Sequence, residues 1–248
     1  MKDYKTPTEI NVDDVTFELT LDRRGAYMVS AYMGKNYKDV AILTPACVTQ
    51  WPRCTGDGNF GTNFGPTDEK KTKFTLDLTS LPIADQDNTN WDAFAKLLTA
   101  LDDKLLEFCH ANSQKLFKKS LTKEMISMLQ IRTVRDKNAG GNKCKSVELK
   151  RAKYSYDALG FQAKNEITIC DATGNKVGAG EVRSGDVVSA TMYIGSVYTG
   201  VGGDKFGIQW SFDAVSVVCQ REKLERKPFV SAFANQQYTF VSEFEMPA

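Results

Sequence analysis

A basic segment in the middle of the chain carries the residues best suited to chemistry with a polyanion. Residues 132–156, RTVRDKNAGGNKCKSVELKRAKYSY, contain eight Lys or Arg and two acidic residues, which gives +6 in a chain whose total is +1. Lysine and arginine bind phosphate oxygens by charge attraction, with release of counterions, and tyrosine rings offer faces on which unpaired bases stack. The segment therefore indicates a single-stranded nucleic acid as ligand.

We expect two kinds of contact from this part of the chain and from one later strand. The predicted phosphate contacts are Arg132, Arg135, Lys143, Lys145, Lys150, Arg151 and Lys153. The predicted stacking residues, of which the last two should face outward from their strand, are Tyr154, Tyr156, Tyr193 and Tyr198. The two glycines in KNAGGNK predict a flexible loop. A solvated loop, or a charged surface for an acidic protein partner, remains the alternative.

Motifs for catalysis and metal binding are weak. Residues 56–61, GDGNFG, have the spelling of a dinucleotide fingerprint, but Pro52 precedes them and TNFGP follows, so a surface loop is predicted rather than a strand-to-helix junction. His110 and Cys109 are neighbours on a predicted helix, where side chains point about 100° apart, which does not suit a nucleophile and its base. We expect no catalytic residue, no metal and no cofactor. An enzyme that uses carboxylates from separate strands is a third alternative.

Composition predicts an ordinary folded protein. The chain has 248 residues, 42% hydrophobic and 25% charged, far from the composition that prevents folding. Six cysteines are spread singly, without a C-x-x-C pair, so we expect reduced thiols and an intracellular location, the cytoplasm or nucleus. No apolar run has the length of a signal peptide or membrane span, and we expect no membrane contact.

The elements that must position the basic segment are mostly strands. Alternation in VTFELTLD, AYMVSAYM and DVAILTPACV predicts three strands in a β-meander, followed by a long loop and the strand KFTLDL. After the basic segment, a hairpin around residues 173–175 and two long strands are predicted. The last strand places four large residues on one face as core: Phe206, Ile208, Trp210 and Phe212.

One long amphipathic helix is predicted in NWDAFAKLLTALDDKLLEFCHAN, because its apolar residues recur at three- and four-residue spacing. Asn90 is the predicted N-cap, and Asp102 and Asp103 should lie on a solvated polar face. A second, shorter helix with Thr122 as its cap is predicted in LTKEMISMLQ.

The order of these elements, with the phrases SGDVVSATMYIGSVYTGVGGDKFGIQWSFDAVSVV and WDAFAKLLTALDDKLLEFCHANSQKLFKK, resembles single-stranded-DNA-binding proteins of large DNA viruses and tailed phages. The resemblance covers about residues 70–220 as a pattern. It implies an oligonucleotide-binding barrel that carries a helix followed by a basic segment. Such proteins often end in a strongly acidic tail that recruits replication partners, whereas the last ten residues here have only Glu243 and Glu245 as acids.

We therefore predict a mainly β (α+β) fold: an antiparallel barrel of oligonucleotide-binding (OB) type, with a long packed helix and the N-terminal β-meander. Residues 1–220 would form one domain with helices at about 90–130, and residues 221–248 a C-terminal tail that serves self-association or a replication protein. The predicted function is sequence-independent binding of single-stranded DNA, or another single-stranded nucleic acid, in replication or repair. The alternative is a structural protein, such as a virion or filament component, whose β-rich body and aromatic tail serve subunit contacts.

Overall fold

The structure is a computed structural model. It describes residues 3–22, 25–34, 39–50, 73–78, 89–139, 142–151, 154–156, 162–164, 168–176, 182, 185–199 and 205–219. For residues 50, 73, 74, 137–139, 142–144, 151, 154–156, 162–164, 199 and 219 it describes the backbone only. The glycine-rich motif, the predicted long loop and the predicted tail lie outside the described residues.

Most of the described elements are strands, which join one ten-stranded sheet and one two-stranded ribbon. The strands are β1 (Val15–Leu21), β2 (Tyr27–Met33), β3 (Ala41–Leu43), β4 (Cys47–Gln50), β5 (Lys73–Asp77), β6 (Val134–Ala139), β7 (Asn142–Arg151), β8 (Tyr154–Tyr156), β9 (Gln162–Lys164), β10 (Thr168–Cys170), β11 (Val187–Thr199) and β12 (Phe206–Cys219). The helices are α1 (Thr89–Ala111), α2 (Ser113–Phe117) and α3 (Lys123–Leu129), with two short 3-10 turns, η1 (Pro7–Glu9) and η2 (Val12–Asp14).

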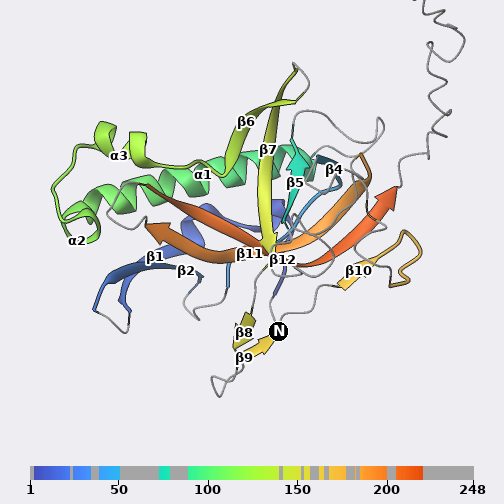
Figure 1. Ribbon diagram of the computed structural model, residues 1–248, viewed down its shortest axis with the longest axis horizontal. Coiled ribbons are helices and arrows are strands. Elements are labelled where there is room, and N and C mark those ends of the chain that lie inside the picture. The colour runs from blue at the N-terminus through green and yellow to red at the C-terminus, as the bar shows by residue number, and fades with distance from the viewer. Residues whose placement is uncertain are drawn as a thin grey trace, which may run out of the picture.

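Five strands of the large sheet close a barrel (Figure 1). Its pairings run β4–β5–β7–β12–β11 and back to β4, and only β7 and β12 are parallel. Numbered by their order in the chain, the barrel strands follow the cycle 1-2-3-5-4, which is the arrangement of the OB barrel. The predicted fold class is confirmed.

The N-terminal strands join the same sheet, although they form no three-stranded meander. β1 and β2 pair as predicted, whereas the third predicted strand divides into β3 and β4, both of which pair with β11. Pro45, which has no N–H, lies in the break. Thr44 bridges it: its N–H donates to the Ala190 carbonyl at 2.9 Å, and its hydroxyl accepts from the Ala190 N–H at 2.9 Å.

The two longest strands, β11 and β12, belong to the barrel and also carry the sheet onward to β2 and β1. The four predicted core residues of β12 are all buried, as the alternation predicts. Along β12, the register with β11 shifts at three irregularities, whose extra residues are Gly195 on β11 and then Asp213 and Val218 on β12. After the second shift the buried positions on β12 become Val215 and Val217.

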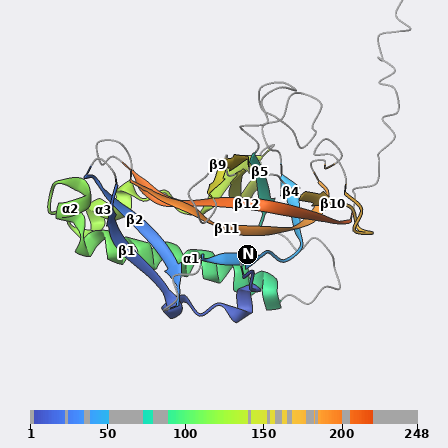
Figure 2. The ribbon, with the colours of Figure 1, turned by 90° about the horizontal axis from the view of Figure 1, so that it is seen from below.

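α1 lies along β11 and β12 and buries a row of leucines against the sheet (Figure 2). Asn90 is the second residue of α1 and not its N-cap, so that prediction is wrong; its side chain accepts from the Thr8 hydroxyl at 2.9 Å. Thr122 caps α3 as predicted, since its hydroxyl accepts from the Met125 N–H. Among the described helices, none has the length and apolar content of a membrane span.

The basic segment folds as a β-hairpin, and the flexible loop predicted there is wrong (Figure 1). β6 pairs with β7 from Val134 opposite Val147 to Ala139 opposite Asn142, and the two glycines lie outside the described residues. Val147 and Leu149 are fully buried and anchor β7 in the barrel, between β5 on one side and β6 and β12 on the other.

Candidate nucleic-acid interface

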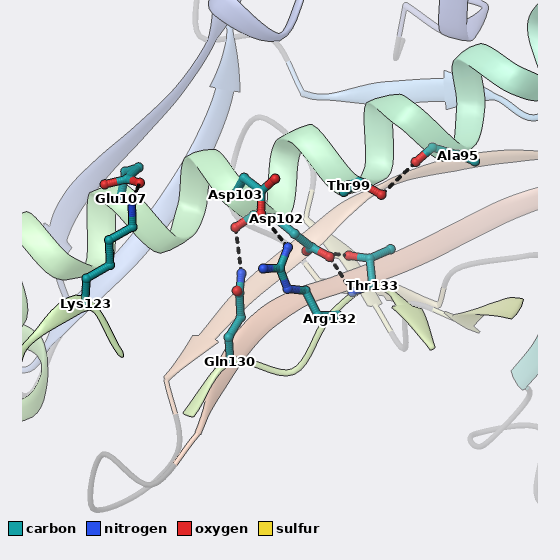
Figure 3. Close-up of polar contacts among 9 residues, drawn as sticks. All are labelled: Ala95, Thr99, Asp102, Asp103, Glu107, Lys123, Gln130, Arg132 and Thr133. Carbon is teal, nitrogen blue, oxygen red and sulfur yellow. Dashed lines mark hydrogen bonds and ion pairs between the residues drawn. The ribbon is translucent and has the colours of Figure 1, made fainter. Parts of the chain in front are cut away.

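A buried carboxylate on α1 holds the chain at the start of the β6–β7 hairpin (Figure 3). Asp102 accepts from the Thr133 N–H at 2.6 Å and from the Thr133 hydroxyl at 2.8 Å. The indole N–H of Trp210 donates to the same hydroxyl at 3.1 Å. Only 1% of Asp102 is exposed, so the solvated position predicted for it is wrong. This part of the polar face of α1 packs against Thr133, whose backbone N–H needs a hydrogen-bond acceptor.

The same region places the first predicted phosphate contact. Arg132 pairs with the exposed Asp103 on α1 at 2.5 Å, and the Gln130 amide donates to the Asp102 carbonyl at 2.6 Å (Figure 3). Burial raises the pKa of the Asp102 carboxyl to about 6, although the hydrogen bonds from Thr133 act in the opposite direction. Arg132 therefore joins the hairpin to the helix, and an acid opposes its charge.

The outer side of the barrel around β7 has a mixed polar surface, which we call the β7 face. Ser146, Glu148 and Lys150 alternate with the buried residues of β7, and cross-strand partners share their side of the sheet. The β7 face consists of Thr75, Arg135, Ser146, Glu148, Lys150, Tyr198 and Gln209. Thr75 and Ser146 are buried, while the larger side chains are partly or fully exposed.

Lys150 lies near the middle of this surface. Its ammonium donates to the Gln209 side-chain oxygen on β12 at 3.1 Å, and the pairing of β7 with β5 places Lys73 directly opposite it. Arg135 is exposed and lies opposite Ser146 on β6. Two cationic side chains thus border the acidic Glu148.

Tyr198 lies across Gly207 on the neighbouring strand. A Cβ added at residue 207 would be 2.9 Å from the Tyr198 hydroxyl oxygen and 2.6 Å from the Ile131 carbonyl oxygen, so the close approach requires glycine. Burial raises the pKa of Tyr198, and the positive charge of Arg135 opposes that rise. The ring, half buried, is therefore within electrostatic reach of Arg135.

Three of the predicted contacts thus share one surface: Arg135, Lys150 and Tyr198. Lys145 is exposed on β7 opposite Asp136, and strand alternation places it on the other side of the sheet from Lys150. The period of two in a strand therefore divides the basic residues of the segment between two sides.

The outward position predicted for Tyr193 is wrong. Only 8% of this residue is exposed, in the stretch of β11 that pairs with β3 on one side and β12 on the other. The Tyr4 hydroxyl donates to the carboxylate of Asp213 nearby, so the N-terminal segment also contacts this part of β11 and β12. Tyr193 belongs to the folded body and not to an open surface.

Five other predicted contacts have no described side chain. Lys143 lies opposite Asn138 in the hairpin, and Arg151 lies opposite Phe212 at the end of β7. Tyr154 and Tyr156 lie two positions apart on β8, which pairs with β9 in the separate ribbon. Lys153 is outside the described residues.

The sequence reasoning missed the polar residues of the β7 face that are not basic: Thr75, Ser146, Glu148 and Gln209. The signal for three of them was available as alternation, since SVELK and GIQW place polar residues between apolar ones. The first of these patterns lies in the basic segment, whose glycines and charges predicted a loop instead.

Buried thiols and scattered acids characterise the rest of the described chain. Cys47 and Cys109 are free and buried, and burial raises the pKa of each thiol to about 12, so both are protonated near neutral pH. Within the described ranges, no cluster of three or more His, Cys, Asp or Glu is arranged to hold a metal ion.

No protein-family model matches this chain, and no curated protein matches it. Its structure is similar to that of gp2.5, a single-stranded DNA binding protein encoded by bacteriophage T7, with TM-score 0.43, 9% identity, and 74% of this chain and 88% of that chain covered. It is also similar to the single-stranded DNA-binding protein from bacteriophage Enc34, with TM-score 0.41, 10% identity, and 86% and 95% covered. The same Enc34 protein in complex with single-stranded DNA gives TM-score 0.41, 10% identity, and 84% and 97% covered. We base the functional proposal on the barrel and the β7 face alone.

Proposed function

We propose that this protein binds single-stranded DNA along the β7 face, without sequence preference. The observation that carries the proposal is the combination of barrel and surface: β5 and β7 are the second and third strands of an OB barrel, and oligonucleotides bind such barrels on the face of these two strands. In this chain that face presents Lys150 on β7, with Arg135 on β6 to one side and, across β12, Tyr198 on β11 to the other.

These residues suit a strand whose bases are unpaired. Arg135 and Lys150 are cations that can each contact a phosphate, and Tyr198 offers a ring against which a base stacks. Because Glu148 lies between the two cations and repels phosphates, we place individual phosphates at Arg135 and at Lys150, and the bases toward Tyr198. A duplex hides its base faces and would lose the stacking contact.

The hairpin beyond the barrel extends the charged surface. Lys143 and Lys145 lie on the part of β7 that pairs with β6, and Figure 1 shows this part projecting away from the barrel. We propose that they contact phosphates on the side of the hairpin opposite to Lys150. The proposed role is in replication or repair, where single strands are exposed, and it involves no catalysis. Contacts through residues 221–248 with a second copy or a replication protein remain a prediction.

The test is fluorescence anisotropy with a labelled, mixed-sequence single-stranded DNA of about 30 nucleotides, with duplex DNA and RNA of equal length as competitors. We expect tighter binding to the single strand than to the duplex. Because each phosphate contact on a single strand adds about 0.7 to the slope of log K against log salt, Arg135→Gln with Lys150→Gln should lower that slope by about 1.4. Lys96→Gln on the exposed side of α1 is the control and should leave the slope unchanged.

Two results would contradict the proposal in different ways. If the wild-type protein does not bind at low salt, it is no single-strand binder, and large assemblies in the same samples would favour the structural alternative. If it binds but the double variant keeps the affinity and slope of the wild type, the ligand uses another surface.

A further inference from the structure

Two lysines converge on one tyrosine ring at the end of the molecule farthest from β10 (Figure 1). The ammonium groups of Lys115 on α2 and Lys118 just after it are each 5.9 Å from the centre of the Tyr27 ring on β2. Both lysines and the adjacent Lys119 are exposed. Each ammonium is attracted to the ring face, but the two repel one another, so the arrangement holds positive charge together at a cost.

The backbone at Lys118 is an independent sign of a constraint. This residue has φ 60° and ψ 14°, and it is the one non-glycine residue with positive φ among those the structure describes. It occupies the C-terminal cap of α2, where glycine adopts this left-handed conformation without a steric penalty. A lysine here retains a strained backbone, and strain of this kind often accompanies function.

This cluster lies beyond the end of the strand that contributes Tyr198. The ring of Phe117, the residue before Lys118, packs at 5.8 Å from the ring of Phe206, which adjoins Gly207 under Tyr198. The exposed Lys205 immediately precedes Phe206. Val197 pairs with Val29, so Tyr27 on β2 lies beside the end of β11. The exposed Lys205 therefore adjoins both the strand end that carries Tyr198 and the packing contact with α2.

We infer that Tyr27, Lys115, Lys118 and Lys119 form a second phosphate-binding surface, the α2 cluster, which takes the phosphodiester backbone of the single strand after it leaves the β7 face. The inference rests on the proposed function. Tyr198 and Tyr27 face opposite sides of the sheet, since the residues directly paired across β11 and β2 are Val197 and Val29 and both are buried. The bound DNA strand therefore turns around the end of the paired strands β11 and β12, and Lys205 lies at that turn.

The length of the single-stranded DNA distinguishes binding at the two surfaces in one experiment. A strand of about 8 nucleotides is within the range that one OB barrel holds, whereas a strand of about 30 can reach both surfaces. For Lys115→Gln with Lys118→Gln, we expect affinity for the short strand within about twofold of wild type. For the long strand, the slope of log K against log salt should fall by about 1.4, which makes the loss of affinity about sevenfold larger at 50 mM than at 200 mM salt. Lys96→Gln with Lys176→Gln removes the same charge from exposed positions elsewhere. This control should change neither the affinity nor the salt slope for either length of DNA.

Lys118→Gly gives a second, independent measure. This substitution removes one ammonium group and also relieves the strain of a lysine backbone in the left-handed conformation. It should therefore raise the melting temperature, and it should weaken binding of the long DNA strand but not of the short one. Equal weakening for both lengths, or unchanged binding of the long strand by both variants, overturns the α2 cluster while the proposed function stands. If the wild-type protein binds neither length, the proposed function fails and the α2 cluster fails with it.

Discussion

Replacing the buried Asp102 with asparagine should remove a large part of the pH dependence of stability. Burial raises the pKa of this carboxyl in the folded state to about 6, well above its value in an unfolded chain. The folded protein therefore holds the proton more tightly, and the contribution to stability is complete below about pH 4 and lost as the pH rises through 6. The difference between the two pKa values corresponds to about 3 kcal/mol of unfolding free energy.

Asparagine suits this test because it fills the same volume and cannot ionise. Its carbonyl can accept from the Thr133 N–H, and its amide can donate to the Thr133 hydroxyl oxygen, which now receives the Trp210 N–H. The variant therefore loses at most part of one hydrogen bond at every pH. The unfolding free energy of the variant minus that of wild type should therefore rise by about 3 kcal/mol between pH 4 and pH 7.5.

The assay is urea unfolding of both proteins at half-unit steps of pH over this range, with the two free energies subtracted at each step. Subtraction cancels the carboxylates that the proteins share. Asp103→Asn is the matched control, because it removes an exposed carboxylate one residue away. A difference curve for Asp102→Asn that is flat, or that has its midpoint below about pH 4.5, would refute the reasoning that the buried charge is costly.

Two further substitutions test contacts that shape the barrel. Gly207→Ala should destabilise the protein by about 1–3 kcal/mol in urea unfolding, because the added Cβ meets the Ile131 carbonyl oxygen at 2.6 Å. It should also weaken DNA binding by displacing Tyr198. Unchanged stability would show that the backbone can move there. Thr44→Val should cost about 1–3 kcal/mol, since it leaves the buried Ala190 N–H without its acceptor. Thr99→Val is its control, because it removes an exposed hydroxyl on α1 that donates to the Ala95 carbonyl at 3.0 Å. It should change stability by less than about 0.5 kcal/mol. Equal losses in the two threonine variants would contradict the role of Thr44 in bridging β3 and β4.

The elements with a strong hydrophobic period were predictable from the sequence. In β12, four large residues recur at every second position, and in α1 the leucines recur at helical spacing, so one face of each element had to be buried. The tip of the β6–β7 hairpin has no such period. From Asp136 and Lys145 toward the connection, polar residues stand at consecutive positions of the sequence, so the pattern resembles that of a loop.

The wrong predictions within the site share one physical cause, which is contact with a segment distant in the sequence. Asp102 has the helical position of a surface residue, and it is buried because Thr133, 31 residues away, needs an acceptor. Tyr193 alternates to the outer side of β11, and only 8% of it is exposed where the N-terminal segment, through Tyr4, contacts this part of β11 and β12. Spacing along one element shows which residues share a side, but not which other segment packs against that side.

The short segment between α3 and β6 explains how the helix positions the proposed interface. Gln130 and Thr133 bond to Asp102, and the Ile131 N–H donates to the Phe206 carbonyl at 2.8 Å, so this segment is fixed to both α1 and β12. Arg135 follows two residues later and reaches the β7 face from that fixed start. The Arg135 Nε–H donates to the Arg132 carbonyl at 3.3 Å, but this bond is exposed and joins the segment to neither α1 nor β12. The charge on the face can therefore be removed while the connection to α1 and β12 stays intact. Arg135→Gln should change DNA affinity with little change in stability, whereas substitutions at Asp102 should act on stability first.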